Sequence, residues 1–142
     1  IMVLAIAGPK LFRVVTESFG GKGRFELTDS RPENVRRLRE AAAAANRGFP
    51  RRLDEATIML RIDVADSGVV NRYKLTMLTA AEVRQAGLIT DQVRPALVQE
   101  VCSNRAYTMT MEKGFSISYS YVDRNDVPAG SVTVRRADCG RD

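Results

Sequence analysis

The segment Val101–Cys139 constrains the fold more than any other, because it places the chain's only two cysteines around one compact supersecondary unit. Within it, apolar side chains alternate with serines from position 115 to 121, a pattern typical of a half-buried strand. The stretch 123–130 is rich in Asp, Asn, Pro and Gly, each of which favours a turn. A second alternating run, 131–136, completes a predicted β-hairpin.

Cys102 and Cys139 flank this hairpin, which leaves three interpretations: a disulfide, two buried thiols or a redox pair. No CxxC motif is present, and neither cysteine has a predicted helix N-terminus to lower its pKa. We favour the disulfide because both cysteines flank one compact unit, where closing the loop would stabilise the fold by ~3–4 kcal/mol. A disulfide would place the domain in an oxidising compartment such as a periplasm.

The chain contains no histidine, and this absence excludes several kinds of site. Ser-His-Asp and Cys-His nucleophilic centres require an imidazole, and two cysteines cannot supply a four-thiolate zinc site. The acidic turn 123–126 offers oxygen ligands but lacks the glycine and distal glutamate of a calcium loop, so we interpret it as a turn. We therefore expect no catalytic site, no metal and no cofactor.

The N-terminal segment 1–29 combines an apolar opening, basic residues and a glycine-rich stretch. The opening IMVLAIAGP is too short to span a bilayer, so it is either the end of a membrane anchor or part of an amphipathic helix. Three glycines at positions 20–23 predict a flexible break. Residues 30–142 are predicted to form a single domain, a size that supports one hydrophobic core.

Positive charge is concentrated near the N-terminus, since residues 1–52 hold 11 Lys and Arg against 5 Asp and Glu, whereas the rest hold 11 against 12. Ser30, Pro32 and Glu33 have the types and spacing of a helix start, and apolar residues then recur at helical spacing as far as Asn46. The arginines of this helix and of the segment after it form a candidate basic interaction patch: Arg36, Arg37, Arg39, Arg51 and Arg52. A solvated face, or one facing anionic lipid, suits them better than nucleic acid, since no aromatic residues are interleaved.

A second hairpin is predicted upstream of the first. Alternating runs at 58–64 and 69–78 are separated by the turn sequence Asp66-Ser67-Gly68. Helix starts follow at Thr79 and Thr90. We therefore predict an α+β domain in which two β-hairpins form an antiparallel sheet of about four strands, with helices packed on one face and one disulfide.

Two stretches of the chain resemble a group of small exported bacterial proteins: FPRRLDEATIMLRIDV, and GFSISYSYVDRNDVPAGSVTVRRADC, with VC closing the helix between them. The shared features are a Cys, a Gly-led strand with two alternating tyrosines, a turn, a strand and a closing Cys. Over residues 49–139, the chain resembles the α/β pilotin family of type II secretion systems in these features. The resemblance implies a two-layer architecture, an envelope location and a protein-binding role.

Three functions are compatible with these observations, and we expect the first. It is a non-enzymatic, membrane-tethered periplasmic module of secretion or surface-assembly machinery that binds an envelope protein through an exposed sheet edge or a groove between sheet and helices. The alternative is a basic module that binds nucleic acid or anionic lipid through the Arg-rich N-terminal third, although we expect no nucleic-acid partner. An enzyme with paired carboxylates would need two convergent acids with shifted pKa values.

Overall fold

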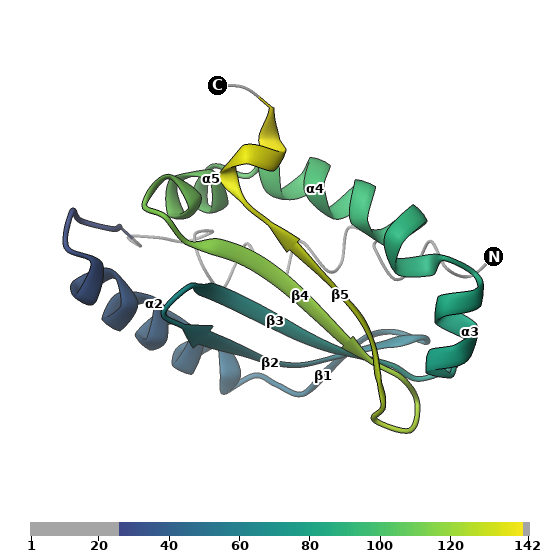
Figure 1. The fold of residues 1–142 in the computed structure, drawn as a ribbon. Coiled ribbons are helices and arrows are strands. Elements are labelled where there is room, and N and C mark those ends of the chain that lie inside the picture. The colour runs from purple at the N-terminus through teal and green to yellow at the C-terminus, as the bar shows by residue number, and fades with distance from the viewer. Residues whose placement is uncertain (1–25, 141–142) are drawn as a thin grey trace.

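The computed structural model describes residues 26–140, which form helices and strands around one sheet (Figure 1). Residues 1–25, where an anchor or an amphipathic helix is predicted, lie outside the described part. Within residues 26–140, no helix is both long and apolar enough to cross a membrane.

Five strands of the described chain form one mixed sheet, in which their spatial order is their order along the chain. Neighbouring strands are antiparallel except β3 and β4, which run parallel. The strands are β1 (Arg51–Asp54), β2 (Thr57–Ala65), β3 (Gly68–Leu75), β4 (Ser116–Val122) and β5 (Pro128–Val134). Both predicted hairpins, β2–β3 and β4–β5, are confirmed.

The prediction of about four antiparallel strands was wrong in two respects. The helices between β3 and β4 return the chain to the end of the sheet where β3 begins, so β4 starts beside Gly68 and runs in the same direction. The short strand β1 was missed because only Leu53 of its four side chains is buried, which leaves no alternating apolar pattern. The fold class is therefore α+β with a five-stranded mixed sheet.

Six helical segments accompany the described strands: α2 (Arg31–Asn46), α3 (Ala80–Gln85), the π-helix η3 (Leu88–Val93), α4 (Arg94–Ser103), α5 (Arg105–Glu112) and the 3₁₀ helix η4 (Arg136–Cys139). The predicted helix starts at Ser30 and Thr79 are confirmed. The Ser30 hydroxyl accepts a hydrogen bond from the Glu33 N–H at 3.3 Å, and Thr79 forms a capping box with Glu82. These caps satisfy N–H groups that have no partner within their helix.

The core lies on one face of the sheet, where buried apolar side chains of the strands meet those of the helices. Leu38 of α2 and Leu97 of α4 are fully buried there. The Tyr73 ring stacks on those of Tyr119 and Tyr121 from β4, with centroids 6.2 and 5.4 Å away. The alternating tyrosines of β4 therefore pack in the core, as the strand pattern predicted.

Cys102 in the last turn of α4 and Cys139 at the end of η4 form the predicted disulfide. Their Cα atoms are 5.4 Å apart, which suits a disulfide. The bond ties the segment after β5 to the helical layer, so it holds the far end of the β4–β5 hairpin in place.

Candidate binding sites

The arginines of the predicted basic interaction patch occupy two elements. Arg36, Arg37 and Arg39 lie on α2, and Arg51 and Arg52 lie on β1. The Arg39 guanidinium is 3.7 Å from the Asp66 carboxylate, and Arg52 donates to the backbone carbonyls of residues 54 and 55. Arg51 is exposed and forms no ion pair with any described residue. The structure thus separates the patch into a helical part and a strand part.

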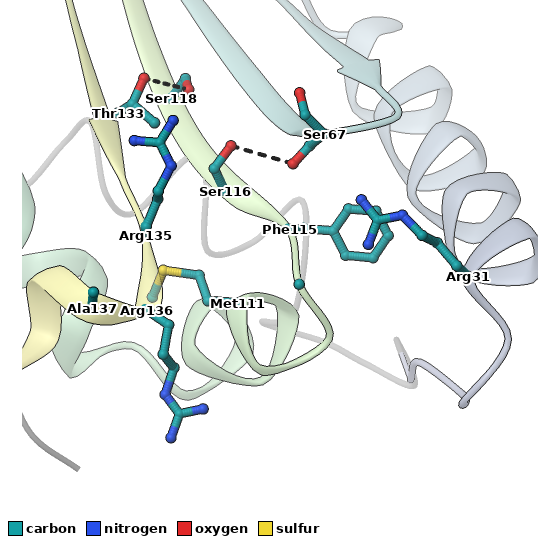
Figure 2. A pocket seen from close by; sticks show the side chains of 11 residues that line it. Arg31, Ser67, Met111, Phe115, Ser116, Ser118, Thr133, Arg135, Arg136 and Ala137 are labelled. Carbon is teal, nitrogen blue, oxygen red and sulfur yellow. Dashed lines mark hydrogen bonds between the residues drawn. The ribbon is translucent and has the colours of Figure 1, made fainter.

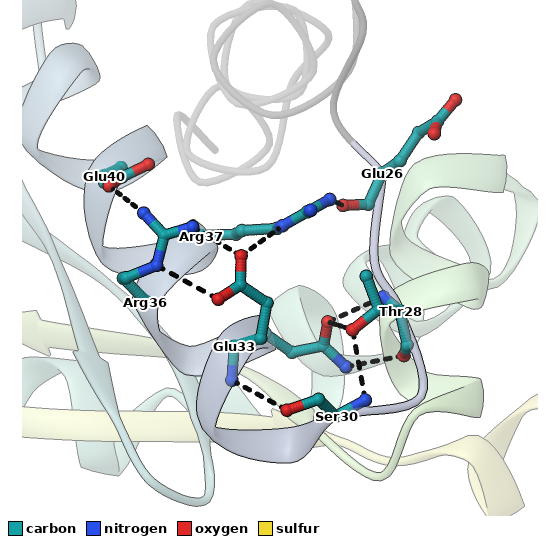
Figure 3. A network of polar contacts seen from close by, with 8 residues as sticks. Glu26, Thr28, Ser30, Glu33, Arg36, Arg37 and Glu40 are labelled. Atoms are coloured by element: carbon teal, nitrogen blue, oxygen red, sulfur yellow. Dashed lines mark hydrogen bonds and ion pairs between the residues drawn. The ribbon is translucent and has the colours of Figure 1, made fainter.

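The helical part of the patch is paired with acidic side chains (Figure 3). Glu33 accepts hydrogen bonds from Arg36 and Arg37, and these bonds lower its pKa to about 2. Arg36 also pairs with Glu40, and Arg37 donates to the Glu26 carbonyl at 2.8 Å. Exposed pairs one helical turn apart add little stability, but they offset the positive charge of the helix. Binding of lipid or nucleic acid by the patch stays a prediction.

A cavity of about 500 Å³, which we call the arginine cavity, lies where β4 begins and β5 ends (Figure 2). Ser116, Ser118 and Thr133 line it from the sheet, Met111 lines it from α5, and Phe115 lines it from the residue before β4. The lining also includes three arginines: Arg31, Arg135 and Arg136. No acidic residue is among the described residues that line the cavity.

The arginines reach this cavity from opposite ends of the described chain. Arg31 is the first residue of α2, and its guanidinium lies 4.2 Å from the centroid of the Phe115 ring. Arg135 directly follows β5, two residues after Thr133, so strand alternation places both on one face. Figure 2 shows Arg135 extending toward Ser118 and Thr133, whereas Arg136 points the other way. This set of arginines was not predicted from the sequence, in which the adjacent Arg135 and Arg136 after a predicted strand were the only signal of it.

A second concavity, which we call the edge groove, lies between β5 and the α3–η3 region and has a volume of about 410 Å³. Its lining includes Val83, Gly87, Ile89, Thr90, Ala129, Gly130 and Ser131. Gly130 has a φ of 154°, and a Cβ atom there would lie 2.9 Å from the Ile89 side chain. A glycine is needed at this position for β5 to approach η3 so closely.

At Ser131, the outward side of the β5 backbone beside this groove forms no hydrogen bond with any described residue. The Arg94 side chain donates to the Thr133 carbonyl at 3.3 Å, so this carbonyl points away from β4. Along an antiparallel strand, N–H and C=O groups of every second residue point the same way, so those of Ser131 also point away from β4. Ser131 is exposed. Among the described residues, the β5 edge at Ser131 and the adjoining groove correspond to the exposed edge and groove of the sequence-based hypothesis, and binding there stays a prediction.

Asp123 fixes the position of α3 next to the edge groove. It is buried, and its carboxylate accepts backbone hydrogen bonds from Asn125 and Val127 in its own turn and from Ala80 at the start of α3, at 2.7 to 2.9 Å. Burial acts to raise the pKa of Asp123, but these hydrogen bonds outweigh it and lower the pKa. Both carboxylate oxygens thus accept backbone N–H groups, and the predicted turn at 123–126 is confirmed. Across residues 26–140, no three metal-ligating side chains converge.

Solved structures with this fold come from two bacterial genera. A protein of Pseudomonas aeruginosa described as "a putative secreted protein" is 21% identical with a TM-score of 0.67, and the match covers 81% of this chain and 100% of that one. The pilotin EpsS of the Vibrio vulnificus type 2 secretion system is 15% identical with a TM-score of 0.59, over 79% and 97%. The type II secretion system pilotin AspS of Vibrio cholerae is 15% identical with a TM-score of 0.52, over 77% and 95%.

These likenesses, together with the sheet and its helical layer, define a small α+β domain with the fold of these pilotins. No protein with a curated description matches the chain. The chain belongs to the family described as "Putative quorum-sensing-regulated virulence factor", whose profile matches residues 29–140. That match includes every described helix and strand.

Proposed function

We propose that this protein is a non-enzymatic interaction module of the cell envelope, membrane-tethered through its N-terminal segment, that binds a partner protein of secretion or surface-assembly machinery. The fold supports this proposal, because it extends over nearly the whole length of two pilotins and of one protein described as secreted. The disulfide supports an envelope location, because such bonds persist in oxidising compartments.

The observation that carries the proposal is the open edge of β5 beside the edge groove. Ser131 directs a backbone N–H and a C=O away from the sheet, and Val83 and Ile89 supply apolar surface next to it. An extended segment of a partner can pair with such an edge through its own backbone, while an apolar side chain enters the groove. The proposed binding mode is therefore the addition of a partner strand to β5.

We test this mode by placing a photo-reactive amino acid at Thr90, an exposed residue of the edge groove, in the full chain expressed in its native host. The cross-linked partner is identified by mass spectrometry. The experiment is repeated with Ser131→Pro, which removes the outward N–H, and with Ser131→Ala, which removes only the hydroxyl and serves as the matched control.

We expect one secretion or surface-assembly protein to cross-link to the parent chain and to Ser131→Ala, and the adduct to be lost with Ser131→Pro. Equal cross-linking of both variants would show that the β5 edge is not used. The absence of a specific adduct at native expression levels would contradict a partner at this groove.

A further inference from the structure

We propose that the arginine cavity binds carboxylates, and that its ligand is an acidic peptide segment. The cavity is separate from the edge groove, and the two linings have no residue in common. The inference therefore does not depend on the proposed binding mode at β5.

Two of the three guanidinium groups of this cavity, those of Arg31 and Arg135, have no carboxylate partner among the described residues. The Arg135 guanidinium forms no hydrogen bond or ion pair with any described residue. Arg31 donates only to the backbone carbonyls of Asp66 and Lys113 and stacks on Phe115, so no carboxylate balances it. Arg136 forms an ion pair with Glu112 at 3.7 Å, so the charge without a described counter-ion belongs to Arg31 and Arg135. A ligand of this site must therefore supply negative charge.

Other acids close to the cavity are already paired. Asp138 accepts the Arg135 backbone N–H at 2.8 Å and lies 3.6 Å from the Arg94 guanidinium. Asp29 pairs with Lys113 at 2.9 Å. The free guanidinium of Arg135 thus remains available for a bidentate contact, the geometry in which arginine recognises a carboxylate.

The hydroxyls of the cavity decide between classes of anion. The Ser116 hydroxyl donates to the Ser67 carbonyl at 3.3 Å, so its oxygen can still accept a hydrogen bond. Ser118 and Thr133 share one hydrogen bond at 3.0 Å, which leaves one of their hydroxyl hydrogens free to donate. A peptide has both N–H donors and carboxylate acceptors to match this mixture, whereas the phosphate of a phosphodiester has acceptors alone. Phe115 and Met111 add an apolar wall for its side chains.

We test the proposal by titrating the oxidised chain with a fluorescent, terminally capped pentapeptide of glycine, aspartate and glutamate. A second peptide carries asparagine and glutamine in place of the acids. The test variant is Arg135→Gln. The guanidinium of Arg135 forms no hydrogen bond or ion pair with a described residue, so the melting temperature of the variant is expected to equal that of the parent. The matched control is Arg51→Gln, which removes the same charge from β1, at the opposite edge of the sheet.

We expect Arg135→Gln to weaken binding of the acidic peptide about tenfold or more, as loss of a charge-assisted hydrogen bond does. Arg51→Gln should change it less than about twofold, and the amide peptide should bind as weakly as the acidic peptide binds Arg135→Gln. Ser131→Pro should leave binding unchanged, which separates this site from the β5 edge.

The proposal is overturned if both arginine variants weaken binding equally, because a general charge effect would then suffice. It also fails if the acidic peptide does not bind at millimolar concentration, or if the two peptides bind alike. Vesicles containing phosphatidylglycerol provide the last arm. Binding to them that depends on Arg135, without binding of the peptide, would assign the cavity to lipid phosphate.

Discussion

Asp123 shows how one side chain connects elements that are distant in the sequence. Its carboxylate accepts hydrogen bonds from its own turn and from the first residue of α3, more than 40 positions earlier. The turn was visible in the sequence because Asp, Asn, Pro and Gly cluster there. The contact with Ala80 was not, because it depends on how α3 packs beside β5.

We expect Asp123→Asn to lower the stability of the domain at neutral pH, because an amide nitrogen cannot accept the backbone N–H groups that the carboxylate accepts. The pKa of Asp123 is lowered in the folded state, so its contribution is present above the unfolded value of 3.8 and is lost as the pH falls through the folded pKa. Urea unfolding should show a difference in the free energy of unfolding between parent and variant at pH 7, and this difference should narrow below about pH 3.8. A gap that stays constant with pH would contradict this role.

The neighbouring exposed residue Asp126 provides the control. It pairs with Lys74 on the surface and has a φ of 65°, a conformation that asparagine tolerates. Asp126→Asn is therefore expected to lower the free energy of unfolding at pH 7 much less than Asp123→Asn does.

At the scale of elements, the parallel pairing of β3 and β4 depends on close backbone contact at Gly68. A Cβ atom at this position would lie 2.2 Å from the Ser116 carbonyl oxygen. The sequence indicated Gly68 only as part of a turn. A turn and a close contact between strands both favour glycine, so the residue type alone did not reveal the contact.

We expect Gly68→Ala to destabilise the domain by about 1–3 kcal/mol, the usual cost of overpacking at a rigid backbone contact. Gly48→Ala is the matched control, since a Cβ there would lie 3.6 Å from the Ala45 carbonyl, an ordinary contact. Denaturant unfolding compares the two variants. Similar free energies of unfolding for both would show that the β3–β4 start can relax.

The two edges of the sheet are treated differently. The short strand β1 pairs only with the first residues of β2 and leaves the rest of that edge without a neighbouring strand. There, the Asn46 side chain of α2 donates a hydrogen bond to the Ile62 carbonyl at 2.8 Å and accepts one from the Ile62 N–H at 2.7 Å. An amide side chain there replaces a missing strand and blocks pairing with another chain. The outward backbone groups of Ser131 on β5 have no equivalent cover among the described residues, which is why the proposed binding mode uses β5.

At the scale of the whole molecule, the disulfide joins the two ends of the segment that contains α5, β4 and β5. Removing it through a Cys102→Ser and Cys139→Ser double variant frees a long loop in the unfolded state. We expect a loss of about 3–4 kcal/mol in the free energy of unfolding.

Urea unfolding measures this loss, and the parent chain under reducing conditions is the control, which should match the double variant. A loss below about 1 kcal/mol would mean that the helical layer holds the hairpin without the bond.

Local patterns in the sequence determined a large part of this structure. Alternating apolar residues predicted both hairpins, helix-capping residues predicted the starts at Ser30 and Thr79, and the spacing of the cysteines around one unit indicated their disulfide. These features depend on interactions between residues that are close in the chain, or on one covalent bond with few candidate partners.

Only the tertiary structure decided the parallel β3–β4 pairing, the strand β1 and the arginine cavity. The predicted arginines of α2 pair with acidic side chains, while Arg31 and Arg135 line one cavity from opposite ends of the described chain. No local pattern links two such positions, because their proximity follows from the direction in which the helices return the chain to the sheet. The long-range packing of the chain therefore formed the site that its local sequence did not reveal.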